Sequence, residues 1–157
     1  MKYLLKKNLV VFVAVFLFTN AHPQGFINTN KTGAKKYLSK FTNEVKLQTV
    51  SAETDSTITF LIRDADKQPL DLVLHFDASG KCDSELRTLN CDSCMQKIVN
   101  RALSEKQYEW QKMDEHTYWS KNSKRLVLRL LPDKPFSFVI QRSILSRKEY
   151  KSQVKGE

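Results

Sequence analysis

The residues whose types and spacing point most directly to chemistry are three cysteines. Cys91 and Cys94 form a CxxC pair, and Cys82 precedes them in the chain. In an exported protein, an odd number of cysteines indicates one disulfide and one remaining thiol. The sequence places the CxxC pair after a strand and at the start of a helix. There the helix dipole and the free backbone N–H groups stabilise a thiolate, as a disulfide oxidoreductase requires.

Three kinds of arrangement of these cysteines are compatible with the sequence: a Cys91–Cys94 disulfide, a disulfide from Cys82 to either of the other two, and no disulfide. If residues 82–88 are extended, they span about 20 Å. Cys82 then cannot reach the other two, because bridged Cα atoms lie at most about 7 Å apart. The disulfide is in that case Cys91–Cys94, with Cys82 buried and free. If residues 83–90 form a loop, Cys82 can close on either partner, and a chain with no disulfide is the third arrangement.

Other features of the sequence argue against redox or metal chemistry at the cysteines. Asp92 adjoins Cys91 and disfavours its thiolate, and consecutive strands are predicted to form hairpins rather than a parallel βαβ unit. Zinc would need the three cysteines with His75 or His116, yet only one knuckle pair is present. The chain also lacks GxSxG and HExxH motifs. We therefore predict no metal and no cofactor, and favour a protein that is not an enzyme.

A second candidate site lies in the last third of the chain. Trp110 and Trp119 could form a ligand-binding face, flanked by Lys121, Lys124 and Arg125 in a way that suits an anionic partner. Packing of the aromatic residues in the core of a sheet is the competing interpretation, and it is favoured because most aromatic side chains are used in this way.

The N-terminus has the pattern of a secretory signal peptide over residues 1–21. Three lysines precede an apolar run of ten residues, Leu9–Phe18, and Thr19-Asn20-Ala21 offers a cleavage site. Ten helical residues cover about 15 Å, half of the hydrocarbon core of a bilayer, so a membrane span is disfavoured. No cysteine lies directly after the apolar run, where a lipid anchor would be attached. We predict an exported protein, periplasmic or extracellular.

Cleavage after Ala21 would leave 136 of the 157 residues, enough for one domain with its own core. The remaining chain has 23 basic and 17 acidic residues, a net charge of +6. Such a balance is compatible with a polyanion as partner, although solubility alone is the favoured explanation.

Hydrophobic periodicity predicts the secondary structure. A helix is expected from Ala34, with Thr32 as its N-cap, and a second helix from the CxxC pair. Strands are expected at 57–63, 70–76 and 82–88, and again at 108–110, 117–119, 125–131 and 136–140, whereas residues 47–55 are ambiguous. In the strand at 82–88, Cys82, Ser84 and Leu86 should face the core and Glu85 and Arg87 the solvent.

Together these elements predict an α+β fold in the order helix, three strands, helix, and three or four strands, which is α-βββ-α-βββ in its shorter form. An antiparallel meander sheet would carry two helices on one face and leave the other face open. An irregular segment (22–32) should precede a single domain (33–142), and a polar basic tail (143–157), either frayed or in a short helix, should follow it. The two helices match at a constant offset of 57 residues, a weak sign of duplication.

The expected function is that of an exported, soluble, non-enzymatic binding domain. Its partner would be a protein, peptide or polyanion bound on the open sheet face. A thiol–disulfide protein that uses Cys91 and Cys94 is the alternative.

Overall fold

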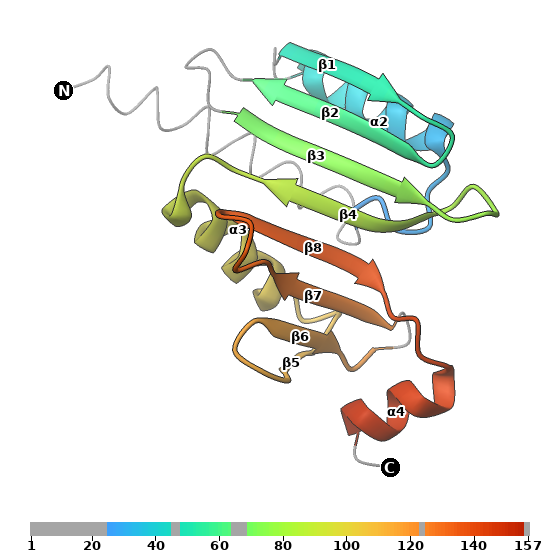
Figure 1. The fold of residues 1–157 in the computed structure, drawn as a ribbon, viewed down its shortest axis with the longest axis vertical. Coiled ribbons are helices and arrows are strands. Elements are labelled where there is room, and N and C mark those ends of the chain that lie inside the picture. Colours follow the sequence, from blue (N-terminus) through green and yellow to red (C-terminus); the bar gives the residue numbers. More distant parts are fainter. Residues whose placement is uncertain (1–24, 45–47, 64–68, 123–124, 156–157) are drawn as a thin grey trace.

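A computed structural model describes residues 25–44, 48–63, 69–122 and 125–155 (Figure 1). The predicted signal peptide and Lys124 lie outside these ranges. All strands belong to one antiparallel sheet, accompanied by helices α2 (Lys31–Glu44), α3 (Asp92–Ser104) and α4 (Arg147–Lys155). The strands are β1 (Gln48–Glu53), β2 (Thr57–Arg63), β3 (Pro69–Phe76), β4 (Cys82–Thr88), β5 (Trp110–Lys112), β6 (Thr117–Ser120), β7 (Leu126–Leu130) and β8 (Ser137–Arg142). The prediction of an α+β protein with an antiparallel sheet is confirmed.

The described chain consists of two halves with the same order of elements, α-ββββ. The first half contains α2 and β1–β4, and the second contains α3 and β5–β8. The strand order is β1-β2-β3-β4-β8-β7-β6-β5, so each half is a meander and the halves meet where β4 pairs with β8. The predicted order lacked a strand in the first half. That strand, β1, lies at the edge of the sheet and has a polar sequence without clear alternation.

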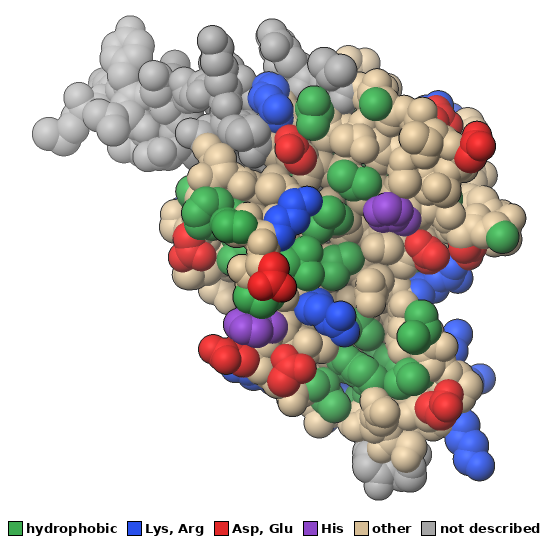
Figure 2. All heavy atoms as spheres, in the orientation of Figure 1, with side chains coloured by type: hydrophobic (Ala, Val, Ile, Leu, Met, Phe, Trp, Pro, Cys, Tyr) green, Lys and Arg blue, Asp and Glu red, His purple; other side chains and the backbone are tan. Residues whose placement is uncertain are grey.

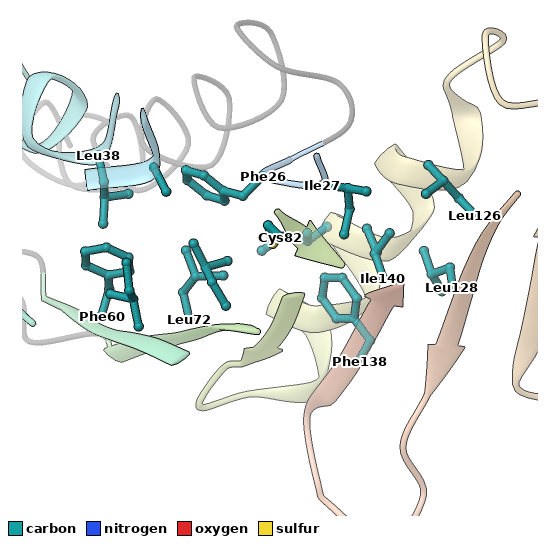
Figure 3. Packing of buried hydrophobic residues seen from close by; sticks show 14 of the residues in the cluster. Phe26, Ile27, Leu38, Phe60, Leu72, Cys82, Leu126, Leu128, Phe138 and Ile140 are labelled. Carbon is teal, nitrogen blue, oxygen red and sulfur yellow. The ribbon is translucent and has the colours of Figure 1, made fainter. Parts of the chain in front are cut away.

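Alternate residues of the strands build a single hydrophobic core. Ile58, Phe60 and Ile62 of β2 pair across the sheet with residues of β3 such as Leu72 and Leu74, and all of these are buried. We call this side of the sheet the core face and the opposite side the outer face. Side chains of α2 and α3 join the same core, namely Ala34, Leu38, Ile98 and Val99. In Figure 3, Leu38 and Phe26 point toward Phe60 and Leu72.

A β-bulge at the start of β4 changes which of its residues face the core. Phe76 pairs with Cys82, whereas His75 pairs with Ser84, so one extra residue stands in β4. An extra residue inverts the alternation of side chains beyond it. The prediction that Ser84 and Leu86 share the face of Cys82 is therefore wrong, and Glu85 is buried on the core face instead.

The segment 25–30, within the region expected to be irregular, is docked against β4. Phe26 and Ile27 are each only 3% exposed. The backbone N–H of Asn28 donates to the carbonyl of Cys82 at 2.8 Å, and the N–H of Cys82 donates to the carbonyl of Thr29 at 2.8 Å. Helix α2 begins at Lys31 because the Asn30 side chain, rather than Thr32, accepts from the free Gly33 N–H at 2.7 Å.

The segment 143–157, expected to be a polar basic tail, contains α4. Its Tyr150 and Val154 are buried against Val127 on the outer face of β7. The Tyr150 hydroxyl lies 2.7 Å from the carbonyl of Ser120 and 2.9 Å from that of Leu126. One end of the outer face is therefore covered by a helix of the chain itself.

The assignment of the two faces predicts unequal costs for truncating two leucines. Leu72→Ala removes a side chain that is 1% exposed on the core face and should lower the free energy of unfolding by about 2–5 kcal/mol. Leu61→Ala, its control on the outer face of the neighbouring strand, should cost about 1 kcal/mol. Urea unfolding measures both costs, and equal losses would contradict the assignment.

Candidate functional site

A continuous band of apolar side chains crosses the outer face of the sheet. Across the strands, Trp119 pairs with Val127, Val73 with Leu86, and Leu86 with Val139. Val127 pairs directly with Gln141, so Val139 is its diagonal neighbour on β8. Leu61 pairs directly with Asp71, so Val73 is its diagonal neighbour on β3. We call the following six residues the apolar band: Leu61, Val73, Leu86, Val139, Val127 and Trp119.

The two ends of the band differ in what covers them. Val127 is 3% exposed because α4 lies on it, and the ring of Trp119 stacks on that of Tyr150 with centroids 5.1 Å apart and planes at 9°. Leu61, Val73, Leu86 and Val139 are only half-buried. Figure 2 shows this face, with hydrophobic side chains spread over its middle among charged groups.

Charged side chains border the uncovered part of the band. Arg63 and Asp71 form a salt bridge at 3.2 Å. Arg129 pairs with Val139 across the strands and is exposed, and no acidic partner for it is found among the residues that the structure describes. His75 is exposed on the same face. Within the described part of the chain, the border therefore offers the ion pair of Arg63 with Asp71 and the guanidinium of Arg129, which has no acidic partner there.

The structure does not bring the predicted ligand-binding residues onto one surface. Trp110 faces the core, where its Nε1 donates to the carbonyl of Ala102 at 2.9 Å, whereas Trp119 lies on the outer face. The register explains the difference, because Trp119 pairs with Gln111 and not with Trp110. Arg125 donates to the carbonyl of Leu145 at 2.8 Å, and Lys121 is exposed.

Cys91 and Cys94 lie at disulfide distance at the start of α3, with Sγ atoms 2.04 Å apart and Cα atoms 5.3 Å apart. This is one of the three arrangements that the sequence left open. Cys91 is the N-cap of α3, and its Sγ accepts the Cys94 N–H at 3.1 Å. Cys82 is free and buried. Burial, followed by the nearby Glu85 carboxylate, raises the pKa of the Cys82 thiol to about 12.

A buried ion pair, which the sequence prediction missed, lies on the core face of β4. Glu85 is fully buried, accepts the Phe26 N–H at 3.0 Å and is bridged by Arg87 at 3.0 Å. Gly25 lies so close to this carboxylate that a Cβ would stand 2.2 Å from one of its oxygens. No signal for this pair was visible in the sequence, because the bulge that turns Glu85 inward has no motif of its own.

Two buried polar atoms in this region, Arg87 Nε and the Tyr108 hydroxyl, have no hydrogen-bond partner among the residues that the structure describes. Burial, together with the nearby Glu105 and Glu85, raises the pKa of Tyr108. The Arg87 guanidinium also lies 5.8 Å from the centre of the Phe138 ring. An unpaired buried charge is strongly destabilising, so the Glu85 carboxylate needs its partners. Its hydrogen bond from the Phe26 N–H therefore fixes the position of segment 25–30.

Within the described ranges, no three His, Cys, Asp or Glu side chains gather in a way that would hold a metal ion. In the same part of the chain, no helix has the length and hydropathy needed to cross a bilayer. Comparison with models of protein families finds no match, and no curated protein or solved structure is significantly similar to the chain.

The contact between Gly25 and Glu85 predicts a strong effect of Gly25→Ala. The alanine would need an unfavourable positive φ (57°), and its methyl group would also collide with the buried carboxylate. Gly80→Ala is a matched control, because Gly80 has a φ of 72° but open space around it. We expect Gly80→Ala to cost about 1 kcal/mol and Gly25→Ala at least about 2 kcal/mol more, measured by urea unfolding. Equal costs would show that segment 25–30 is not docked on Glu85.

The positions of the cysteines predict the result of a thiol titration. The native protein should not react with a thiol reagent, because Cys82 is buried and the pKa of its thiol is raised. The denatured, unreduced protein should react with about one equivalent, and Cys82→Ser should abolish that reaction. Three reactive thiols after denaturation without reductant would disprove the Cys91–Cys94 pairing.

Proposed function

We propose that this chain is an exported, non-enzymatic module that binds another protein through the uncovered part of the apolar band. In this proposal the domain has two layers, with α2 and α3 on the core face and the partner on the outer face. The observation that carries the proposal is the band itself. Four half-buried apolar side chains adjoin one another across β2, β3, β4 and β8, and no described element covers them.

The size and character of this surface suit a protein partner. Three strand spacings of about 4.8 Å separate β2 from β8, so the uncovered band is about 14 Å long. Fully buried apolar centres with polar borders are typical of protein–protein interfaces, where a few central side chains supply most of the binding energy. Leu86 has band residues on both sides, Val73 and Val139, and is therefore the expected centre.

Export is supported by the sequence pattern at residues 1–21, and a Cys91–Cys94 pair at disulfide distance is compatible with an oxidising compartment. The same pair motivates the alternative, a thiol–disulfide protein. Its support is the position of Cys91 as the N-cap of α3, where its sulfur accepts a backbone N–H. If this alternative holds, the wild-type chain will reduce insulin disulfides catalytically and Cys91→Ser will not.

Variants of the band test the proposed binding function. Leu86→Asp places a charge at the centre of the surface, and Ile144→Asp is its control at a side chain that is 98% exposed and outside the band. A protein from the exported fraction of the native host should be retained by immobilised wild type and Ile144→Asp, and lost with Leu86→Asp.

Circular dichroism and urea unfolding should first show that both variants remain folded. Retention of the same proteins by folded Leu86→Asp would refute the proposal.

A further inference from the structure

The covered end of the apolar band shows what kind of element this surface accepts. Helix α4 places Tyr150 on Trp119 and Val154 on Val127, and these two residues are one helical turn apart. Ser146 and Glu149 cap the helix reciprocally, with the Ser146 N–H donating to Glu149 at 2.8 Å. A nine-residue amphipathic helix is thus sufficient to bury this part of the band.

The uncovered end continues the same surface without a break. Val139 is the diagonal neighbour of Val127, and Leu86 and Val73 follow on the next two strands. At 1.5 Å per residue, a helix of about ten residues covers the roughly 14 Å from Leu61 to Val139. The required length is therefore close to that of α4.

The pairing of the strands excludes the addition of a strand at the uncovered band. β2, β3, β4 and β8 each have a neighbour on both sides, so their backbone N–H and C=O groups are already used. An added strand needs a free edge, which among the described strands only β1 and β5 provide. Recognition on the band must therefore use side chains, as in the binding of an amphipathic helix to an apolar surface.

Arg129 adds a requirement on the charge of the partner. It lies directly opposite Val139 on the outer face, so any element that covers Val139 also comes close to Arg129. No described acidic residue pairs with Arg129. Covering such a guanidinium with an apolar or basic element is unfavourable, whereas a carboxylate can bind it with two hydrogen bonds.

We propose that the partner element on the uncovered band is an amphipathic helix that presents apolar residues at i, i+3 or i+4, and i+7, and an acidic residue facing Arg129. This inference rests on the proposed binding function and specifies the element that the face recognises. The partner helix would bury Val73, Leu86 and Val139 as α4 buries Val127.

The test is selection of displayed peptides on the immobilised full-length chain. Two libraries are compared, one on a stable helical scaffold and one of extended, disulfide-free peptides. The helical library should yield binders with the apolar spacing given above and an enriched acidic position. Their affinity should fall at least about tenfold for Leu86→Asp, which corresponds to 1.4 kcal/mol, and remain unchanged for Ile144→Asp. Arg129→Glu should reverse the preference from acidic to basic residues.

The inference is overturned if the helical library yields no binders, if the binders lack helical spacing, or if Leu86→Asp leaves their affinity unchanged. Failure of the inference is distinguishable from failure of the proposed function. If a natural partner binds in a way that depends on Leu86 but no helical peptide binds, only the proposal that the partner element is a helix is refuted. A natural partner that does not depend on Leu86 would refute the binding face.

Discussion

The pairing of β4 with β8 is the contact on which the rest of this structure depends. Each half of the chain folds into a meander of four strands, and only this pair joins the two meanders into one sheet. The hydrophobic core and the apolar band both continue from β4 to β8 across this junction. On the core face Glu85 is opposite Ile140, and on the outer face Leu86 is opposite Val139. Without the junction, the apolar band would be divided into two smaller patches.

The bulge at the start of β4 determines which residues of β4 face the core and which face outward at this junction. It turns Leu86 outward, into the centre of the band, and turns Glu85 inward, where the carboxylate receives the Phe26 N–H and Arg87. The N-terminal segment 25–30 is thereby fixed over β4, and Phe26 and Ile27 complete the core. A local irregularity in one strand thus connects the placement of the N-terminal segment to the composition of the proposed binding face.

Clear alternation made part of this fold predictable from the sequence. β2 alternates over its full length and β3 from Asp71 to Phe76, and the outward position of Val73 was predicted correctly. The face of Leu86 was predicted wrongly because a bulge leaves no signal in hydrophobic periodicity. The segment that contains α4 was left open between a frayed tail and a short helix, because only Tyr150 and Val154 mark an apolar side within a strongly basic segment. A shared ligand-binding face of the two tryptophans, the less favoured interpretation, could not be tested from the sequence, because the sequence does not give the register of β5 and β6, which places them on opposite faces.

Photo-cross-linking from the band in the native host tests the central claim most directly. A photoreactive amino acid is placed singly at positions 73, 86 and 139 of the outer face, with position 144 as the exposed control. We expect one and the same protein to be cross-linked from all three band positions and not from position 144. No adduct from the band, or equal adducts from position 144, would contradict the claim that the uncovered apolar band is a binding surface.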